Sequence, residues 1–276
     1  MNESIAYIGL LADEEIELDS AALMLSALDH EGADIDSYLD LLRSITDALQ
    51  EARADIGESS LHDGAAQGAL LAQVLGGQFG FAGDSATYDA PLNADMIRVL
   101  DRRSGLPVSL SILYVAAARR LGWTAHALNT PGHVLVSVGE RDERALIDPF
   151  RRGAPVPAEQ LQAVIERALG AGASPSPAHV EPMSNRMTLV RLLLNQATRA
   201  EQSGDTWRAR TLYARMTVIA PEHGAGWWEL ARLQLALGDV DAARASLSAM
   251  LEITRDPERR GQINQLLVQL SGQASS

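Results

Sequence analysis

The sequence lacks two residue types that often carry covalent chemistry, because none of its 276 residues is cysteine and none is lysine. Without cysteine there is no thiolate nucleophile, no disulfide and no thiolate ligand for a metal. Without lysine there is no amine for a Schiff base and no P-loop lysine for nucleotide phosphates. Thiol-dependent and lysine-dependent catalysis are therefore both excluded.

Aromatic residues are also scarce, at 4% of the chain, although 46% of the residues are hydrophobic. Small aliphatic side chains, chiefly alanine and leucine, must therefore fill the interior. A chain of this length is typical of one large or two ordinary domains, and we expect two.

Long apolar runs are absent, since no stretch approaches the roughly 20 residues that span a bilayer. The first residues, Met1 to Ser4, carry no positive charge of the kind that opens a secretory signal. We therefore expect a cytoplasmic protein without a membrane partner, and the absence of cysteine fits that compartment.

Basic charge is scarce in one part of the chain only. Residues 1–60 contain 15 acidic residues and 2 arginines, whereas residues 61–276 contain 21 of each, and together they give the net charge of −13. No basic face for a phosphate backbone is evident, so nucleic acid is not an expected partner. The acidic segment is interpreted as the solvated surface of helices, with a partner-binding face as the alternative.

Apolar residues recur at helical spacing along most of the chain. Pro107 suits the first turn of one helix and Gly122 follows its end. A helix that runs to residue 75 is expected to finish in a left-handed cap at Gly76-Gly77. The predicted helices cover residues 18–28, 35–54, 65–75, 94–102, 107–121, 187–203, 206–219, 226–237, 240–254 and 257–270.

Three short β-strands are predicted between the central helix and residue 149. In the second, Val134, Val136 and Val138 share one face of the strand, and His133, Leu135 and Ser137 share the other. The predicted strands cover residues 124–129, 133–138 and 144–148. A stretch rich in Gly, Ala, Ser and Pro then predicts a linker over 171–182, which separates a mixed domain (1–170) from a helical one (183–276).

The helical domain contains an internal repeat. Gly204-Asp205 recurs as Gly238-Asp239, 34 residues later, and Ala209 recurs as Ala243 at the same interval. A 34-residue period of paired helices is typical of tetratricopeptide repeats. Two units are fewer than such stacks usually need, so the last helix and the first domain are expected to cap them. A plain helical bundle with coincidental spacing is the alternative.

A set of short motifs lies between residues 79 and 153. The motifs are Phe81–Asp84, Tyr88, Asn93, Val99-Leu100, Arg103, Gly105–Pro107, Ser109-Leu110, Leu121-Gly122, Pro131–His133 and Ile147–Phe150. Together they resemble the transglutaminase-like core of a bacterial family that couples this core to tetratricopeptide repeats. The order and spacing of the motifs are kept over about 75 residues, and the helical repeats follow as they do in that family.

The resemblance implies an α+β fold: N-terminal helices and a papain-like, transglutaminase-like core with a small antiparallel sheet, followed by tetratricopeptide-like helices. Catalytic members of the superfamily place a cysteine at the start of the central helix, a histidine near one following strand and an aspartate on the next. The helix dipole and the imidazolium lower the pKa of such a thiol, and the carboxylate orients the imidazole.

His133 and Asp148 occupy the histidine and aspartate positions of this pattern, and the cysteine is missing. Counting back from Leu121-Gly122 places its position near Pro107, and a shift of two residues reaches Ser109. A serine-type triad of Ser109, His133 and Asp148 is therefore one hypothesis. The other is that Ser109 is an ordinary first-turn serine and the His–Asp pair only pins two strands together.

Three functions remain open from the sequence. The preferred one is a non-catalytic protein-interaction protein or scaffold, whose repeats bind a protein or peptide. The alternative is a serine-dependent hydrolase or acyltransferase that uses Ser109, His133 and Asp148. A third is a small-molecule binder that uses the inherited pocket. No cofactor is expected, and the scattered histidines predict no metal site.

Overall fold

The computed structural model describes residues 3–54, 62–140 and 142–273, and its internal contacts divide the chain into two units. Residues 12–192 form the core unit, and residues 3–11 together with 193–273 form the repeat unit. Within the described ranges, no helix is both long enough and apolar enough to cross a membrane.

One buried helix, α6 (Pro107–Arg120), is the centre of the core unit. Every residue from Pro107 to Ala118 is buried. A helix that is buried on all sides has apolar side chains on all of its faces, and the sequence of α6 has this pattern. Gly122, at φ 77°, ends the helix in the left-handed conformation that glycine adopts without strain. The other helices of the unit are α2 (Leu18–Ala27), α3 (Ile35–Ala54), α4 (Gly64–Leu71), α5 (Met96–Arg102), α7 (Ala158–Leu169) and the start of α8 (Asn185–Gln202).

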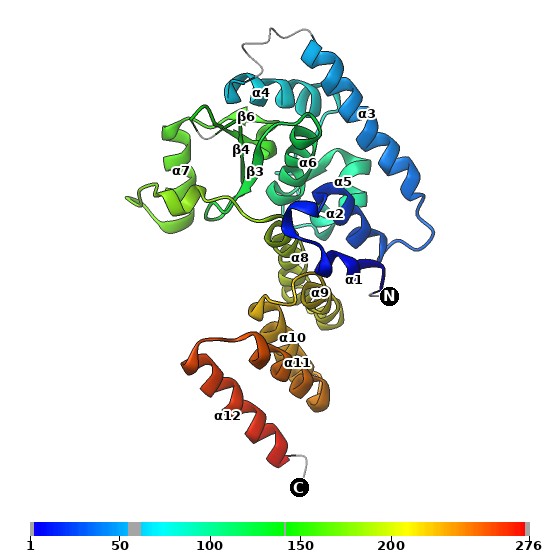
Figure 1. The fold of residues 1–276 in the computed structure, drawn as a ribbon, viewed down its shortest axis with the longest axis vertical. Helices are drawn as coiled ribbons and strands as arrows, with labels where there is room; N and C mark the ends of the chain where they lie inside the picture. The colour runs from blue at the N-terminus through cyan, green and yellow to red at the C-terminus, as the bar shows by residue number, and fades with distance from the viewer. Residues whose placement is uncertain (1–2, 55–61, 141, 274–276) are drawn as a thin grey trace. The chain divides into compact units, whose positions relative to one another are not determined.

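A four-stranded antiparallel sheet packs against α6 (Figure 1). The three predicted strands are confirmed as its first three members, and the order follows the sequence. Leu128 and Leu135 pack with Leu161 of α7, a helix that the sequence analysis did not predict. The strands are β3 (Ala125–Leu128), β4 (Leu135–Val138), β5 (Ala145–Asp148) and β6 (Ala154–Pro155), and a separate parallel pair joins β1 (Ala82–Gly83) to β2 (Ser104–Gly105).

The predicted left-handed cap at Gly76-Gly77 is wrong. The chain continues from α4 into a π-helical segment, Ala72–Gln78, and the next glycine with positive φ after this segment is Gly80. Gly76 is required for a different reason, since a Cβ there would lie 2.4 Å from the carbonyl oxygen of Arg152. The glycine therefore permits close approach of two backbones and does not end the helix.

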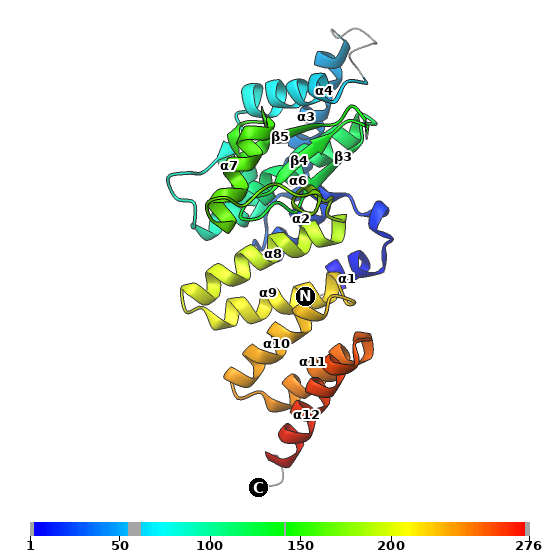
Figure 2. The same ribbon diagram turned by 90° about the vertical axis from the view of Figure 1, so that its left-hand side faces the viewer.

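The repeat unit consists of helices in antiparallel pairs, seen along the lower part of Figure 2. Gly204 and Gly238 both adopt positive φ, at 80° and 78°, and the aspartates that follow them cap the next helices. Asp205 accepts a hydrogen bond from Arg208 N and Asp239 accepts one from Ala242 N. The 34-residue repeat is thus a repeated Gly-Asp turn. The helices are α1 (Glu3–Leu10), the end of α8, α9 (Thr206–Ile219), α10 (Gly224–Ala236), α11 (Val240–Ile253) and α12 (Pro257–Gln273).

The segment predicted as a linker, residues 171–182, includes a 3-10 helix, Pro177–Val180, and is grouped with the core unit by its contacts. The contacts also group α1 with the repeat unit, although it lies at the start of the sequence. The division into a mixed domain (1–170) and a helical domain (183–276) therefore stays a prediction from the sequence.

Candidate functional site

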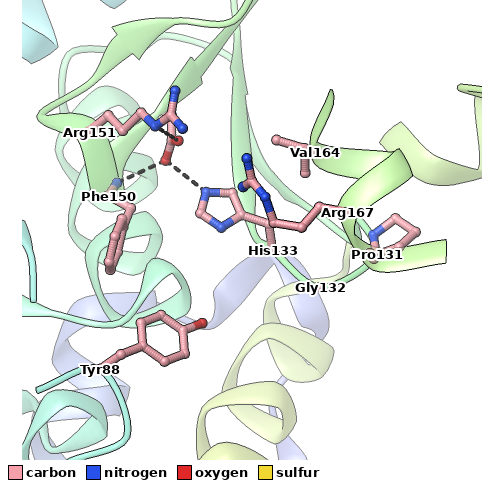
Figure 3. A pocket seen from close by; sticks show the side chains of 10 residues that line it. Tyr88, Pro131, Gly132, His133, Phe150, Arg151, Val164 and Arg167 are labelled. Carbon is pink, nitrogen blue, oxygen red and sulfur yellow. Dashed lines mark hydrogen bonds and ion pairs between the residues drawn. The ribbon is translucent and has the colours of Figure 1, made fainter. Parts of the chain in front are cut away.

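His133 and Asp148 lie together at one end of the sheet. In the antiparallel pair β4 and β5, Val136 is opposite Ile147, so His133, just before β4, lies close to Asp148, the last residue of β5. His133 Nε2 lies 2.9 Å from Asp148 Oδ1. Because a carboxylate accepts the proton of Nε2, the lone pair of a neutral ring is on Nδ1. In Figure 3 this second nitrogen lies on the side of the ring towards Tyr88.

The Asp148 carboxylate is held by the backbone as well as by the imidazole. The residue is 1% exposed, and its Oδ1 also accepts a hydrogen bond of 3.0 Å from Phe150 N. Its Oδ2 lies 3.7 Å from Arg151 Nε, a longer contact. Since the carboxylate caps the short helix Pro149–Arg151, its position does not depend on His133 alone.

Ser109 lies in the first turn of α6 and is fully buried, with no exposed surface. Its hydroxyl donates a hydrogen bond of 2.9 Å to the carbonyl oxygen of Asn93. The structure therefore brings His133 and Asp148 together and directs the Ser109 hydroxyl to the backbone. Ser111, one turn further from the helix start than Pro107, has a long contact of 3.4 Å to the Val134 carbonyl.

The His–Asp pair lines a cavity of about 390 Å³, which we call the His133 cavity (Figure 3). Aromatic rings form part of its wall: Phe150 lies edge-on to His133 at 6.0 Å and edge-on to Tyr88 at 5.8 Å. Its volume falls in the range typical of small-ligand sites. The lining residues are Tyr88, Pro131, Gly132, His133, Asp148, Phe150, Arg151, Val164, Arg167 and Ala168.

A buried polar network holds the loop that carries Tyr88. Arg102 donates to Asp84 Oδ2 at 2.7 Å and to Asn93 Oδ1 at 2.8 Å. Asp84 also accepts bonds from the amide and the hydroxyl of Thr87, at 2.8 and 2.6 Å. Asn93 Nδ2 donates to the carbonyls of Thr87 and Tyr88. The loop therefore has little freedom to move Tyr88 away from the cavity.

The pKa of the Asp84 carboxyl is well below its usual range, because the Thr87 hydroxyl and amide donate to it and the Arg102 guanidinium lies beside it. We expect Asp84→Asn to lower the free energy of unfolding by about 1–2 kcal/mol at pH 7. A carboxyl with a depressed pKa stabilises the fold above the pKa of unfolded aspartate, about 4, and loses that contribution as the pH falls further. The difference from the wild type should therefore be constant from pH 7 to about 5 and shrink in stronger acid.

Urea denaturation at a series of pH values measures this difference, with Asp142→Asn at an exposed position as the matched control. A difference that grows as the pH is lowered from 5 to 3 would contradict the role of the ionised carboxylate.

Several residues of the His133 cavity were not predicted as site residues from the sequence. Tyr88 and Phe150 belong to the matched motifs but have no assigned role there, and Arg151 follows directly after the motif. Arg167 lies on α7, which was not predicted, although Leu161, Val164 and Ile165 recur there at helical spacing and could have identified the helix. Among the described residues no cluster of three or more His, Asp or Glu side chains is arranged to hold a metal ion.

The chain is similar to known proteins along its whole length. A protein from Xylella fastidiosa (strain 9a5c) designated "UPF0162 protein" is 28% identical over 264 residues, which cover 95% of this chain and 92% of that protein. Human F-box only protein 21 is 35% identical over 129 residues, 43% of this chain and 20% of that protein. A crystal structure of menin aligns with a TM-score of 0.42 and 14% identity over 95% of this chain and 73% of menin.

Two family models match in the order that the motifs predicted. A tetratricopeptide-repeat model matches residues 200–266, where the Gly-Asp turns recur. A model of the transglutaminase-like superfamily matches residues 39–194, which contain α6, the four-stranded sheet and the His133–Asp148 pair. The chain therefore belongs to the transglutaminase-like superfamily, as a member without a cysteine and with tetratricopeptide repeats after its core.

Proposed function

We propose that this protein is a non-catalytic, cytoplasmic protein-interaction protein, in which the transglutaminase-like core and the repeats each bind. One observation carries the non-catalytic part: the Ser109 hydroxyl is buried and donates to the Asn93 carbonyl, and no serine or threonine is among the described residues that line the His133 cavity. A serine is far less acidic than a thiol, so it needs a direct hydrogen bond to the imidazole to be deprotonated.

The repeats support the interaction part of the proposal. Paired helices with a 34-residue period stack into surfaces that commonly bind peptides or helices. Trp207, on α9, is 64% exposed and lies against Arg210, whose guanidinium carbon is 5.2 Å from the ring centroid. Exposed tryptophan and arginine are typical of residues that dominate protein interfaces. A protein or peptide partner is therefore proposed for this part of the chain.

The serine-hydrolase alternative, with Ser109, His133 and Asp148 as a triad, is kept because of one observation. The 2.9 Å contact between His133 and Asp148 is the arrangement that a general base requires. For this alternative to hold, the Ser109 hydroxyl must leave the Asn93 carbonyl and reach Nδ1 of the imidazole.

Turnover measurements separate the two functions. We expect the purified full chain to hydrolyse p-nitrophenyl acetate and an N-acyl amino-acid amide no faster than the His133→Ala variant does. A fluorophosphonate probe is expected to leave Ser109 unlabelled, with a known serine hydrolase as the positive control. Hydrolysis that both His133→Ala and Ser109→Ala abolish would establish the enzyme.

Partner binding is tested by photo-cross-linking, because a chain without lysine does not react at side chains with amine-directed reagents. With benzoylphenylalanine in place of Trp207, we expect a discrete cross-linked product in cells. The same residue in place of Asp40, an exposed position on α3, serves as the control. Products that are absent at Trp207, or identical at both positions, would contradict binding at the repeats.

A further inference from the structure

The His133 cavity differs in charge from the protein around it. The chain as a whole carries a formal charge of −13, yet the cavity is lined by two arginines, one histidine and a single acidic residue. That acidic residue, Asp148, already accepts from His133 and from Phe150 N. The two arginines outnumber this one carboxylate, so the wall of the cavity carries an excess of positive charge.

Arg167 contributes most of this excess. It projects from α7 towards His133 in Figure 3, and it has no hydrogen bond or ion pair with any of the residues that the structure describes. Arg151 adds a second guanidinium, which is 50% exposed and only loosely paired with Asp148 at 3.7 Å. A guanidinium presents several N–H groups in a plane and binds carboxylate or phosphate oxygens by two bonds at once.

The rest of the wall is apolar. Phe150 and Tyr88 present ring surface, and Val164 and Pro131 lie on the side of α7 (Figure 3). An ion alone would leave this surface against water, whereas a ligand with an apolar body buries it. The cavity thus combines a cationic side with an aromatic one.

We propose that the His133 cavity binds a ligand with an anionic head, a carboxylate or a phosphate, on an apolar or aromatic body. Arg167 and Arg151 bind the head, and Phe150 and Tyr88 pack on the body. The inference rests on the proposed function, in which this site binds and does not react.

Titration of the full chain with two matched pairs of probes tests the charge requirement. The first pair is N-acetyl-L-phenylalanine and its amide, and the second is phenyl phosphate and phenol. Ligand-observed NMR or calorimetry measures the dissociation constants, which are about millimolar for fragments of this size. We expect at least one anion to bind tenfold or more tightly than its neutral partner, and the better anion identifies the head group.

Arginine variants test whether the anion binds in the His133 cavity. Arg167→Gln is expected to weaken anion binding about five- to tenfold, and Arg151→Gln to weaken it in the same direction. Arg144→Gln is the matched control, because Arg144 is also exposed but does not line the cavity. It should change the dissociation constant less than twofold.

Two outcomes overturn the proposal: equal binding of anion and neutral partner, or binding that Arg167→Gln leaves unchanged. Neither outcome contradicts the proposed non-catalytic function, provided that N-acetyl-L-phenylalanine amide is not hydrolysed during the titration. Appearance of N-acetyl-L-phenylalanine from its amide, seen in the same spectra, would instead contradict the non-catalytic function.

Discussion

Replacing Gly83 by alanine is expected to lower the free energy of unfolding of the core unit by about 1–3 kcal/mol, because the added methyl group overlaps the Phe150 ring. A Cβ at residue 83 would lie 2.3–2.4 Å from three ring carbons of Phe150, well inside van der Waals contact. The ring lies edge-on to Tyr88 and His133 and lines the His133 cavity, so a shift away from residue 83 breaks these ring contacts. The substitution should therefore also displace Phe150 from the His133 cavity and weaken ligand binding there.

Urea denaturation of the full chain measures the effect on stability. Gly77→Ala is the matched control, since its added Cβ would have only one neighbour, at 3.8 Å, and its φ is not positive. A Gly83→Ala variant as stable as Gly77→Ala would show that Phe150 packs elsewhere in solution.

Removing the Asp19 carboxylate is expected to have a similarly large effect. Asp19 is 1% exposed, and both of its oxygens bind the Arg120 guanidinium, at 2.6 and 2.8 Å. This bidentate pair joins α2 to the end of α6. Asp19→Ala leaves a partly buried guanidinium without its counter-ion, which costs about 2–3 kcal/mol after allowance for its 31% exposure.

The control for this prediction is another Asp–Arg pair in the same acidic segment. Asp40 and Arg43 on α3 are paired but are 69% and 68% exposed, so Asp40→Ala should cost less than about 0.5 kcal/mol. Both variants are compared by chemical denaturation under the same conditions. Equal effects would mean that the Asp19–Arg120 pair is no more protected from water than a surface pair.

Hydrophobic periodicity was sufficient to predict most helices and the three main strands. The signal is strong in α6 because Pro107 and Gly122 mark its ends, and in the repeats because the Gly-Asp turn recurs after 34 residues. Local backbone preferences decide these features, and they are present in the sequence itself. Asp19 shows the limit: it was interpreted as one of many solvated acids, and only the tertiary position of Arg120 makes it a buried one.

The candidate site was predictable only in part. The motif spacing identified His133 and Asp148, and their 2.9 Å contact follows from strands that are neighbours in both sequence and space. The environment of Ser109 depends on Asn93, which lies in the short 3-10 helix Pro91–Ala94, and no periodicity in the sequence encodes the position of that helix. Arg167 reaches the cavity from α7, whose apolar residues do recur at helical spacing, but only the tertiary structure shows that this helix packs beside the sheet with Arg167 on the cavity.

The grouping of α1 with the repeat unit has a consequence for the order in which the protein is made. Residues 3–10 pack against α9, which begins at Thr206, so α1 leaves the ribosome before a partner that lies roughly 200 residues further along the chain. At about 5–20 residues per second, that interval is about 10–40 s. During it, the buried side chains of Ile5 and Ile8 lack their native cover, whereas residues 12–192 already have all of their own contacts. The core unit is therefore free to fold during synthesis, whereas α1 can join the repeat unit only after α9 has been made.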